Sequence, residues 1–293
     1  MQFRHQLRHT IPTHLNMKTT LLLFTILSVN FVHAQKLELK WKTDTVFRVP
    51  ESVYLDTKND VLYVANIDGK SDQKDGKGFI SKLGRDGKVI TLEWVGGLNA
   101  PKGMGVVKNN LYVADITAVV VIDIATGKIV TTHEIEGAKF LNDVTTDEKG
   151  NVYISDSGAG KIYQIKNNGK PELFFESADL KRVNGLLSLN DGLYVADAGT
   201  GVNYKLTTDK KLNKFGETSP GADGIVMIGK EGYIVSCWGG EIFFVDATGK
   251  SQKMLDTKEQ KLNSADIAYD SKTKTVFVPT FFGNSVMAYT FSK

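Results

Sequence analysis

The sequence contains very little cysteine or histidine, the two side chains behind most nucleophilic and zinc chemistry. Its single cysteine, Cys237, excludes an intramolecular disulfide. A Ser-His-Asp triad needs an imidazole beside its nucleophile, and an HExxH zinc site needs two on one helix face. After the first 34 residues the chain retains only His133. The other four histidines all precede that point: His5, His9, His14 and His33.

The two remaining residues of this kind are expected to be structural. His133 lies in VTTHEIEG, a pattern typical of an exposed outer strand, and a surface histidine is the commoner case. Cys237 lies in YIVSCWGG, where we expect a small packed apolar residue. Triads and HExxH sites are therefore excluded. Any chemistry must come from oxygen ligands, carboxylates or lysines.

The first 34 residues form a segment with its own pattern. They contain three basic residues and no acid, then the apolar run LLLFTILSVNFV, then VHA before Gln35. This order predicts a secretory signal peptide, whose apolar run is too short to span a membrane. Met17 would begin a more ordinary signal peptide, which makes residues 1–16 an over-long start. We expect residues 35–293 to be exported to the periplasm or outside the cell.

An excess of charge of one sign is also absent once this segment is removed. The full sequence has 36 basic and 33 acidic residues, and the segment takes away three basic residues and no acid, which leaves 33 of each. The basic isoelectric point therefore comes from the leader, and no nucleic-acid footprint remains. We expect a monomer with a small-molecule partner, no nucleic acid and no membrane span.

Internal repeats dominate the remaining chain. Six similar segments can be aligned at Tyr63, Tyr112, Tyr153, Tyr194, Ile234 and Phe277, and the spacings between them are 49, 41, 41, 40 and 43 residues. Repeats of this length are typical of propellers and solenoids. The segments are LYVANI, LYVADI, VYISDS, LYVADA, YIVSCW and VFVPTF.

Each repeat contains four short apolar or alternating runs that are separated by Gly, Asn and Asp turns. In the third repeat the runs are DVTTD, VYISD, KIYQIK and PELFFES. β-Branched and aromatic runs between such turns predict strands, and no amphipathic helix interrupts them. Four strands per forty residues is the plan of a propeller blade. We therefore predict an all-β, six-bladed β-propeller with four antiparallel strands per blade.

The two ends of the chain are predicted to close the ring. The sixth repeat supplies only three strands, ADIAYD, TVFVPTF and SVMAYTF, before Lys293. The N-terminal run KLELKWK, residues 36–42, has no other place, and as the outermost strand of the last blade it fills the open edge. Residues 35–293 are then a single domain. The segment 68–78 lengthens the first repeat and is expected to be a surface loop, because it is too polar and glycine-rich to be buried. Its acids miss the calcium-loop pattern, which disfavours a calcium site there.

Polar residues begin the strands that are expected to line the central channel. Four of them are oxygen donors: Glu51, Asn142, Asn184 and Asp223. Two carboxylates in a narrow channel repel each other unless a divalent cation balances them, and amide oxygens add ligands without charge. Such a set favours Ca²⁺, with Mg²⁺, Mn²⁺ or Zn²⁺ as alternatives. Asp and Asn before Gly also form turns, so a purely structural role stays open for each residue.

Two further channel positions complete the set of six. They are Lys102 in APKGMG and the SADI turn that contains Ala265 and Asp266. Lys102 could steady a developing oxyanion or a substrate carboxylate, and it could equally be a solvated lysine at the rim. The expected site therefore gathers one position from each repeat.

These patterns resemble the gluconolactonase and regucalcin family (senescence marker protein) of six-bladed propellers over the whole of residues 35–293. The likeness is carried by PES, LNDVTTDEKGNVYISD, VNGLLSLNDGLYVAD and ADGIVMIGKEGYIVSCWGGEIFFVD. The resemblance implies that Glu51, Asn184 and Asp223 bind one divalent metal. It also implies that Asn142 faces the substrate or a water held by the metal.

The resemblance further implies hydrolysis of a lactone or related ester. A cation would polarise the carbonyl, and Asp223 would accept a proton. The family usually has an arginine two places before the third-repeat asparagine, where this sequence has Phe140, and Ser52 and Val53 replace the usual glycine and proline. A more apolar ester or lactone is therefore expected. The alternative is a non-catalytic propeller that binds a ligand or a protein.

Overall fold

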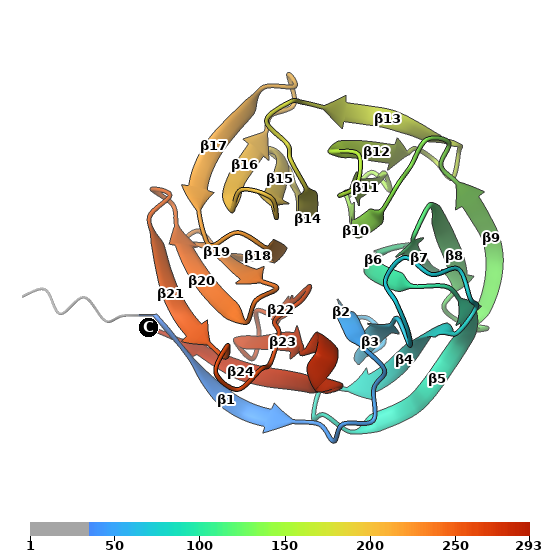
Figure 1. The fold of residues 1–293 in the computed structure, drawn as a ribbon, viewed down its shortest axis with the longest axis horizontal. Helices are drawn as coiled ribbons and strands as arrows, with labels where there is room; N and C mark the ends of the chain where they lie inside the picture. The colour runs from blue at the N-terminus through green and yellow to red at the C-terminus, as the bar shows by residue number, and fades with distance from the viewer. Residues whose placement is uncertain (1–34) are drawn as a thin grey trace, which may run out of the picture. The chain divides into compact units, whose positions relative to one another are not determined.

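Six four-stranded antiparallel sheets surround a common centre in the computed structural model, which describes residues 35–293 (Figure 1). We number the blades in the chain order of their innermost strands. The fold is thus the six-bladed β-propeller that the repeats predicted. Residues Ala34–Lys293 form one compact unit. The predicted signal peptide and the suggested over-long start at residues 1–16 lie outside the described residues.

The first five blades each run outward from the channel in chain order. Blade 1 comprises β2 (Pro50–Asp56), β3 (Val61–Asn66), β4 (Gly78–Gly84) and β5 (Val89–Leu98). Blade 2 comprises β6 (Pro101–Val107), β7 (Asn110–Asp115), β8 (Ala118–Asp123) and β9 (Lys128–Glu134). Blade 3 comprises β10 (Leu141–Thr146), β11 (Val152–Asp156), β12 (Lys161–Ile165) and β13 (Pro171–Glu176).

The remaining blades follow the same plan, except that the last one combines the two ends of the chain. Blade 4 comprises β14 (Val183–Leu189), β15 (Gly192–Asp197), β16 (Val202–Leu206) and β17 (Leu212–Glu217). Blade 5 comprises β18 (Ala222–Ile228), β19 (Gly232–Cys237), β20 (Glu241–Asp246) and β21 (Ser251–Asp256). Blade 6 comprises β22 (Ala268–Asp270), β23 (Thr275–Pro279), β24 (Val286–Ser292) and β1 (Lys36–Lys42), and the 3₁₀ turn η1 (Phe281–Gly283) lies between β23 and β24.

Burial follows the position of a strand within its blade. The second strand β7 is buried at every residue except its first, whereas all seven residues of the outermost strand β9 are at least partly exposed. A middle strand has neighbouring blades on both faces, so it needs a near-continuous apolar run such as LYVA. The core accordingly lies between blades. One cluster joins Tyr63 and Ile80 of blade 1 to Leu111 and Val113 of blade 2.

The N-terminal strand closes the last blade, as the sequence predicted. β1 pairs antiparallel with β24, and Leu37 lies opposite Phe291. Leu37 is also part of the cluster that contains Ile234 of blade 5, so β1 is held by packing as well as by its ladder. Among residues 35–293 no helix is long and apolar enough to cross a membrane.

Closure by β1 gives a prediction with a matched control on the same strand. Leu37 is 8% exposed and Leu39 is 57% exposed. Leu37→Ala is expected to lower the free energy of unfolding by about 2 kcal/mol or more, because it leaves a cavity beneath the closing strand. Leu39→Ala should change it by less than about 0.5 kcal/mol. Urea unfolding of the two variants measures the difference, and equal effects would show that β1 does not seal the core.

Candidate functional site

The innermost strands bring the predicted site residues together. Each of the five residues is the second residue of its strand, and each is buried. All five line one cavity of about 330 Å³ at the mouth of the channel. They are Glu51 on β2, Lys102 on β6, Asn142 on β10, Asn184 on β14 and Asp223 on β18. Turns are therefore not what these residues form, because each lies within a strand.

Irregular pairing at the start of these strands turns the site residues away from the ladder. The register between β10 and β11 shifts between Leu141 and Val144, so Asn142 has no regular partner across the ladder. β6, β14 and β18 shift at the same place, and the irregular stretch of β2 is one residue shorter, between Pro50 and Ser52. Bulges of this kind are common beside active sites because they redirect side chains.

Glycines after the site residues allow the inner strands to approach closely. A side chain at Gly185 would collide with the backbone oxygen of Asp223 on the next inner strand, and one at Gly224 would collide with Asp266. The dipeptides Asn184-Gly185 and Asp223-Gly224 are thus close-packing positions in the channel. Asn-Gly and Asp-Gly are also common in turns. Here, however, the glycine is needed because its missing Cβ lets two backbones approach closely.

A recurring aspartate at the end of the second strand holds the segment that leads into the inner strand. Asp156 accepts hydrogen bonds from the backbone N–H groups of Lys139 and Phe140, both at 2.9 Å. In blade 4, Asp197 accepts from the N–H groups of Lys181 and Arg182 at 2.8 and 2.9 Å. Asp115 of blade 2 binds the N–H groups of Asn99 and Ala100 in the same way. The sequence signal for this support is the Asp that ends LYVAD and VYISD.

Two buried oxygens in the cavity have no hydrogen-bond partner. They are Oε2 of Glu51 and Oδ1 of Asn184. The amide of Asn184 donates to Oδ1 of Asp223 at 3.2 Å, so its free oxygen and the Asp223 carboxylate belong to one cluster. A buried acceptor without a partner costs about 1–3 kcal/mol, which makes two in one pocket a marker of something the pocket receives.

Asn142 has a similar arrangement on the neighbouring blade. Its amide Nδ2 donates to Oγ of Ser157 at 3.2 Å, and Ser157 in turn donates to the backbone oxygen of Val183 at 2.6 Å. This chain links the start of β10 to the start of β14. The carbonyl oxygen of Asn142 is therefore the part of its side chain that stays available to a ligand.

Burial strongly shifts the acidity of the channel carboxylates. It raises the pKa of Asp223 to about 8, and Asp143 adds to the rise, while the hydrogen bond from Asn184 and the charge of Arg182 oppose it. The pKa of Glu51 is raised well above 4.5, first by burial and then by Asp223. A carboxylate in a low-dielectric channel with like charges beside it resists ionisation. The pocket therefore favours either a proton or a cation on these groups.

Two deeper carboxylates lie below the cavity. Asp143 accepts from the backbone N–H groups of Val144 and Leu186, each at 2.6 Å, and thereby ties blade 3 to blade 4. Asp266 of the SADI turn accepts from Oγ of Ser52 at 2.5 Å and does not line the cavity. Burial raises the pKa of Asp143 to about 6. The sixth repeat thus supplies a channel carboxylate below the other five site residues.

Lys102 is buried, not a solvated rim lysine. It is 1% exposed, and its ammonium donates to the backbone oxygens of Ala100 and Ser71 at 2.8 and 3.0 Å. The ring of Phe140 lies 4.4 Å away on another side. Burial lowers the pKa of Lys102 to about 8. To donate to a substrate oxygen, Lys102 would have to exchange one of these carbonyl contacts.

The loop 68–78 is an irregular segment between β3 and β4, as predicted, but it also takes part in the pocket. Ser71 lines the cavity and binds Lys102 through its backbone oxygen. Nζ of Lys74 donates to Oγ1 of Thr117 at 2.7 Å, which fastens the loop to blade 2. Composition predicted the loop, but it held no signal for this path over the channel mouth.

Sequence patterns did not single out two residues of the pocket wall, Trp238 and Arg182. Trp238, Phe281 and Phe282 line the cavity together with Phe140 and Arg182. Phe281 and Phe282 are in η1, a turn that sequence patterns do not mark. Arg182 lies two residues before Asn184, the same offset that separates Phe140 from Asn142. This repeat of the offset was the available signal.

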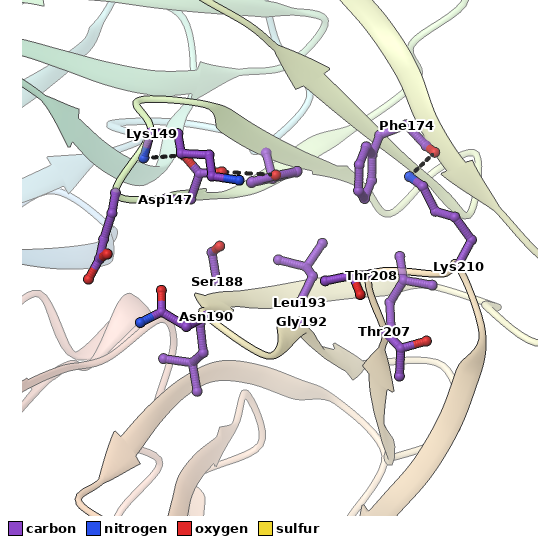
Figure 2. A pocket seen from close by; sticks show the side chains of 14 residues that line it. Asp147, Lys149, Phe174, Ser188, Asn190, Gly192, Leu193, Thr207, Thr208 and Lys210 are labelled. Carbon is purple, nitrogen blue, oxygen red and sulfur yellow. Dashed lines mark hydrogen bonds between the residues drawn. The ribbon is translucent and has the colours of Figure 1, made fainter.

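A second cavity lies between blades 3 and 4, at the opposite ends of their inner strands (Figure 2). It measures about 280 Å³. Figure 2 shows Lys210 beside Phe174. The ammonium of Lys210 donates a hydrogen bond to the backbone oxygen of Phe174 at 2.9 Å. Asp147 accepts from Tyr153 at 3.1 Å and from the N–H of Lys149 at 3.0 Å. These polar groups satisfy one another, unlike those in the channel pocket.

The oxygen donors of the channel pocket are of the kind that binds a hard cation, although only two of them are carboxylates. Among residues 35–293 no group of three or more His, Cys, Asp or Glu side chains is placed to hold a metal. The channel pocket instead offers two carboxylates and two amides, including the two unpartnered oxygens. Oxygen-only sets of this kind suit Ca²⁺, Mg²⁺ and Mn²⁺ better than softer metals.

Comparison with known proteins supports the fold. A gluconolactonase from Xanthomonas campestris is 14% identical with a TM-score of 0.63, and the match covers 87% of each chain. A catalytically inactive histidine-to-alanine variant of virginiamycin B lyase from Staphylococcus aureus, solved with quinupristin, is 15% identical with a TM-score of 0.63, over 88% of this chain and 99% of the other. A chain in the nidogen/laminin complex is 18% identical with a TM-score of 0.59, over 72% and 82%. No family model and no curated protein matches the sequence.

The pKa of Asp223 predicts how the stability of the metal-free protein depends on pH. The group ionises near 3.8 when unfolded and near 8 when folded, so the stability it contributes is fully present below about pH 4 and is lost as pH rises toward 8. With chelator present, Tm should fall between pH 5 and pH 7.5. In Asp223→Asn the decline should be smaller. Thermal unfolding across this range tests both, and a flat profile in the unsubstituted protein would contradict the burial argument.

Proposed function

We propose that this chain is a divalent-metal-dependent hydrolase of a small lactone or ester. The observation that carries the proposal is the pair of unpartnered buried oxygens, Oε2 of Glu51 and Oδ1 of Asn184, beside Asp223 in one cavity. A pocket that buries acceptors without donors is poised for a positive ligand. The likeness to a gluconolactonase, which is one of several propellers of this shape, adds support at the level of the fold.

In this proposal Glu51, Asn184 and Asp223 hold the cation, and Asn142 offers a further oxygen. The preferred ion is Ca²⁺, with Mg²⁺, Mn²⁺ or Zn²⁺ as alternatives, because every donor is an oxygen. When bound, a divalent cation polarises a carbonyl and makes a nearby water more acidic. The predicted signal peptide would deliver this activity to the periplasm or outside the cell.

The chain's own residues supply the proton transfers. Asp223 takes a proton as the oxygen of water attacks the acyl carbon, and returns it to the ring or alcohol oxygen as the C–O bond breaks. The product is a hydroxy acid from a lactone, or an acid and an alcohol from an ester. Asn184 holds the carboxylate through its hydrogen bond to Oδ1 of Asp223. Without a cation, burial raises the pKa of Asp223 to about 8. A bound divalent cation would lower this pKa, which favours the ionised form that accepts the proton.

A non-catalytic binding propeller is the alternative. The observation that favours it is the aromatic surface at the mouth, where Trp238 is 40% and Phe282 is 64% exposed. Large exposed apolar patches commonly mark sites of binding. A lyase reaction that depends on a histidine is less favoured, because His133, the one histidine within residues 35–293, lies on the outermost strand β9, away from the cavity.

The proposal predicts that Asp223 is needed for both metal and turnover. The unsubstituted protein should bind about one Ca²⁺ per chain, its Tm should rise with added Ca²⁺ by mass action, and it should hydrolyse members of a panel of lactones and aryl esters. Asp223→Ala should lose most of the metal and at least about 100-fold in kcat/KM. Asp209→Ala, an exposed aspartate in a remote turn, is the matched control.

Two results would contradict parts of the proposal separately. Unchanged metal content in Asp223→Ala, measured by elemental analysis after equilibration with Ca²⁺, would reject the metal site. Metal that depends on Asp223, combined with no turnover of any substrate in the panel, would reject the hydrolase and favour the binding propeller.

A further inference from the structure

Arg182 is the unassigned charged group of the channel pocket. Its side chain lines the cavity and is exposed, and within residues 35–293 no hydrogen bond or ion pair uses its guanidinium. Its backbone is nevertheless fixed, because its N–H donates to Asp197 at 2.9 Å and its carbonyl accepts from the N–H of Ala198. A guanidinium on an anchored backbone with its donors free is suited to bind a planar anion with two hydrogen bonds.

The position of Arg182 corresponds to that of Phe140 in the preceding blade. The N–H of each residue is held by the aspartate that ends the second strand of its own blade, at 2.9 Å in both cases. Both side chains line the same cavity. Phe140 covers the ammonium of Lys102, so the cation of blade 2 is closed off on that side. Arg182 has no such cover.

The balance of charge in the pocket favours an anionic ligand. Glu51 and Asp223 are the two acids of the cavity wall, and the divalent cation of the proposed function would neutralise them. Lys102 is engaged by the backbone oxygens of Ala100 and Ser71. Arg182 then remains as the positive charge with free donors.

The pocket also has an apolar part, an aromatic wall built from blades 5 and 6. Trp238, Phe281 and Phe282 contact one another edge to face, with ring centroids 4.8–5.9 Å apart. Phe281 has a φ of 48°, a costly conformation for a bulky residue. The turn is held by Asn284, whose Oδ1 accepts from the N–H of Val49 at 2.9 Å. A strained turn that presents two rings to a cavity is typical of a ligand-binding feature.

From this juxtaposition we infer that the pocket takes a ligand with a carboxylate and a planar aromatic body, the carboxylate bound by Arg182 and the ring by Trp238 and Phe282. Resting on the proposed function, this inference names the substrate class as a carboxylate-bearing aryl ester or lactone. The closely packed rings offer apolar contact, and the guanidinium on its anchored backbone selects for negative charge.

The test compares two ligands that differ only in charge. Calorimetry on the full mature protein with Ca²⁺ present would measure 4-acetamidobenzoate against the neutral 4-acetamidobenzamide. The benzoate should bind roughly 10- to 100-fold more tightly, and Arg182→Gln should remove that preference without changing Ca²⁺ binding. Lys181→Gln, at the adjacent exposed lysine outside the cavity, should keep it. Phe282→Ala should weaken both ligands alike, by about 5- to 10-fold.

The outcomes separate this inference from the proposed function. Equal affinity for the two ligands, a preference that survives in Arg182→Gln, or no binding of either would overturn the inference. Hydrolysis of 4-acetoxybenzoate is measured on the same samples. A charge preference that depends on Arg182, together with no hydrolysis of 4-acetoxybenzoate or of any substrate in the panel, would support the ligand class and overturn the hydrolase.

Discussion

The pocket depends on one repeated interaction, in which a buried aspartate at the end of a blade's second strand binds two successive backbone N–H groups ahead of the inner strand. Asp156 and Asp197 make it in blades 3 and 4, and thereby fix Phe140 and Arg182 two residues before Asn142 and Asn184. The oxygens of this carboxylate are hydrogen-bonded to backbone N–H groups, so the aspartate orders the loop without adding an unpaired charge to the channel. The same support can therefore present an aromatic ring in one blade and a cation in the next.

In the channel the situation is the opposite, because some of the buried side-chain oxygens have no hydrogen-bond donor. Glu51 and Asn184 each leave one acceptor unpartnered, and burial pushes the acidity of Asp223 far from its ordinary range. Each such group costs stability, and two of them in one pocket are the reason to expect a ligand there. Packing elsewhere offsets this loss of stability. Glycines after Asn184 and Asp223 let the inner strands approach closely, and apolar side chains pack extensively between the blades.

A comparison of blades 3 and 4 shows how selectivity can change on a constant scaffold. Phe140 closes the pocket over Lys102, whereas Arg182 opens a cationic side toward the cavity. Trp238 and the two phenylalanines of η1 line the same pocket as the carboxylate and amide oxygens that could bind a cation. The arrangement combines buried oxygen-bearing side chains drawn from the repeats with walls drawn from irregular segments. Fold neighbours with different activities fit this division, because the function of a propeller lies in its loops and strand starts.

The sequence alone determined the repeating strands, the closure by residues 36–42 and the alignment of oxygen-bearing residues at the strand starts. These follow from short apolar runs between turn residues that recur every 40 to 49 residues. The same regularity placed Glu51, Asn142, Asn184 and Asp223 in one pocket. Only the tertiary structure decided that Lys102 is buried, that the loop carrying Ser71 reaches the pocket, and that Arg182 and Trp238 line its walls. Those positions depend on loop paths set by long-range contacts, which leave no periodic trace in the sequence.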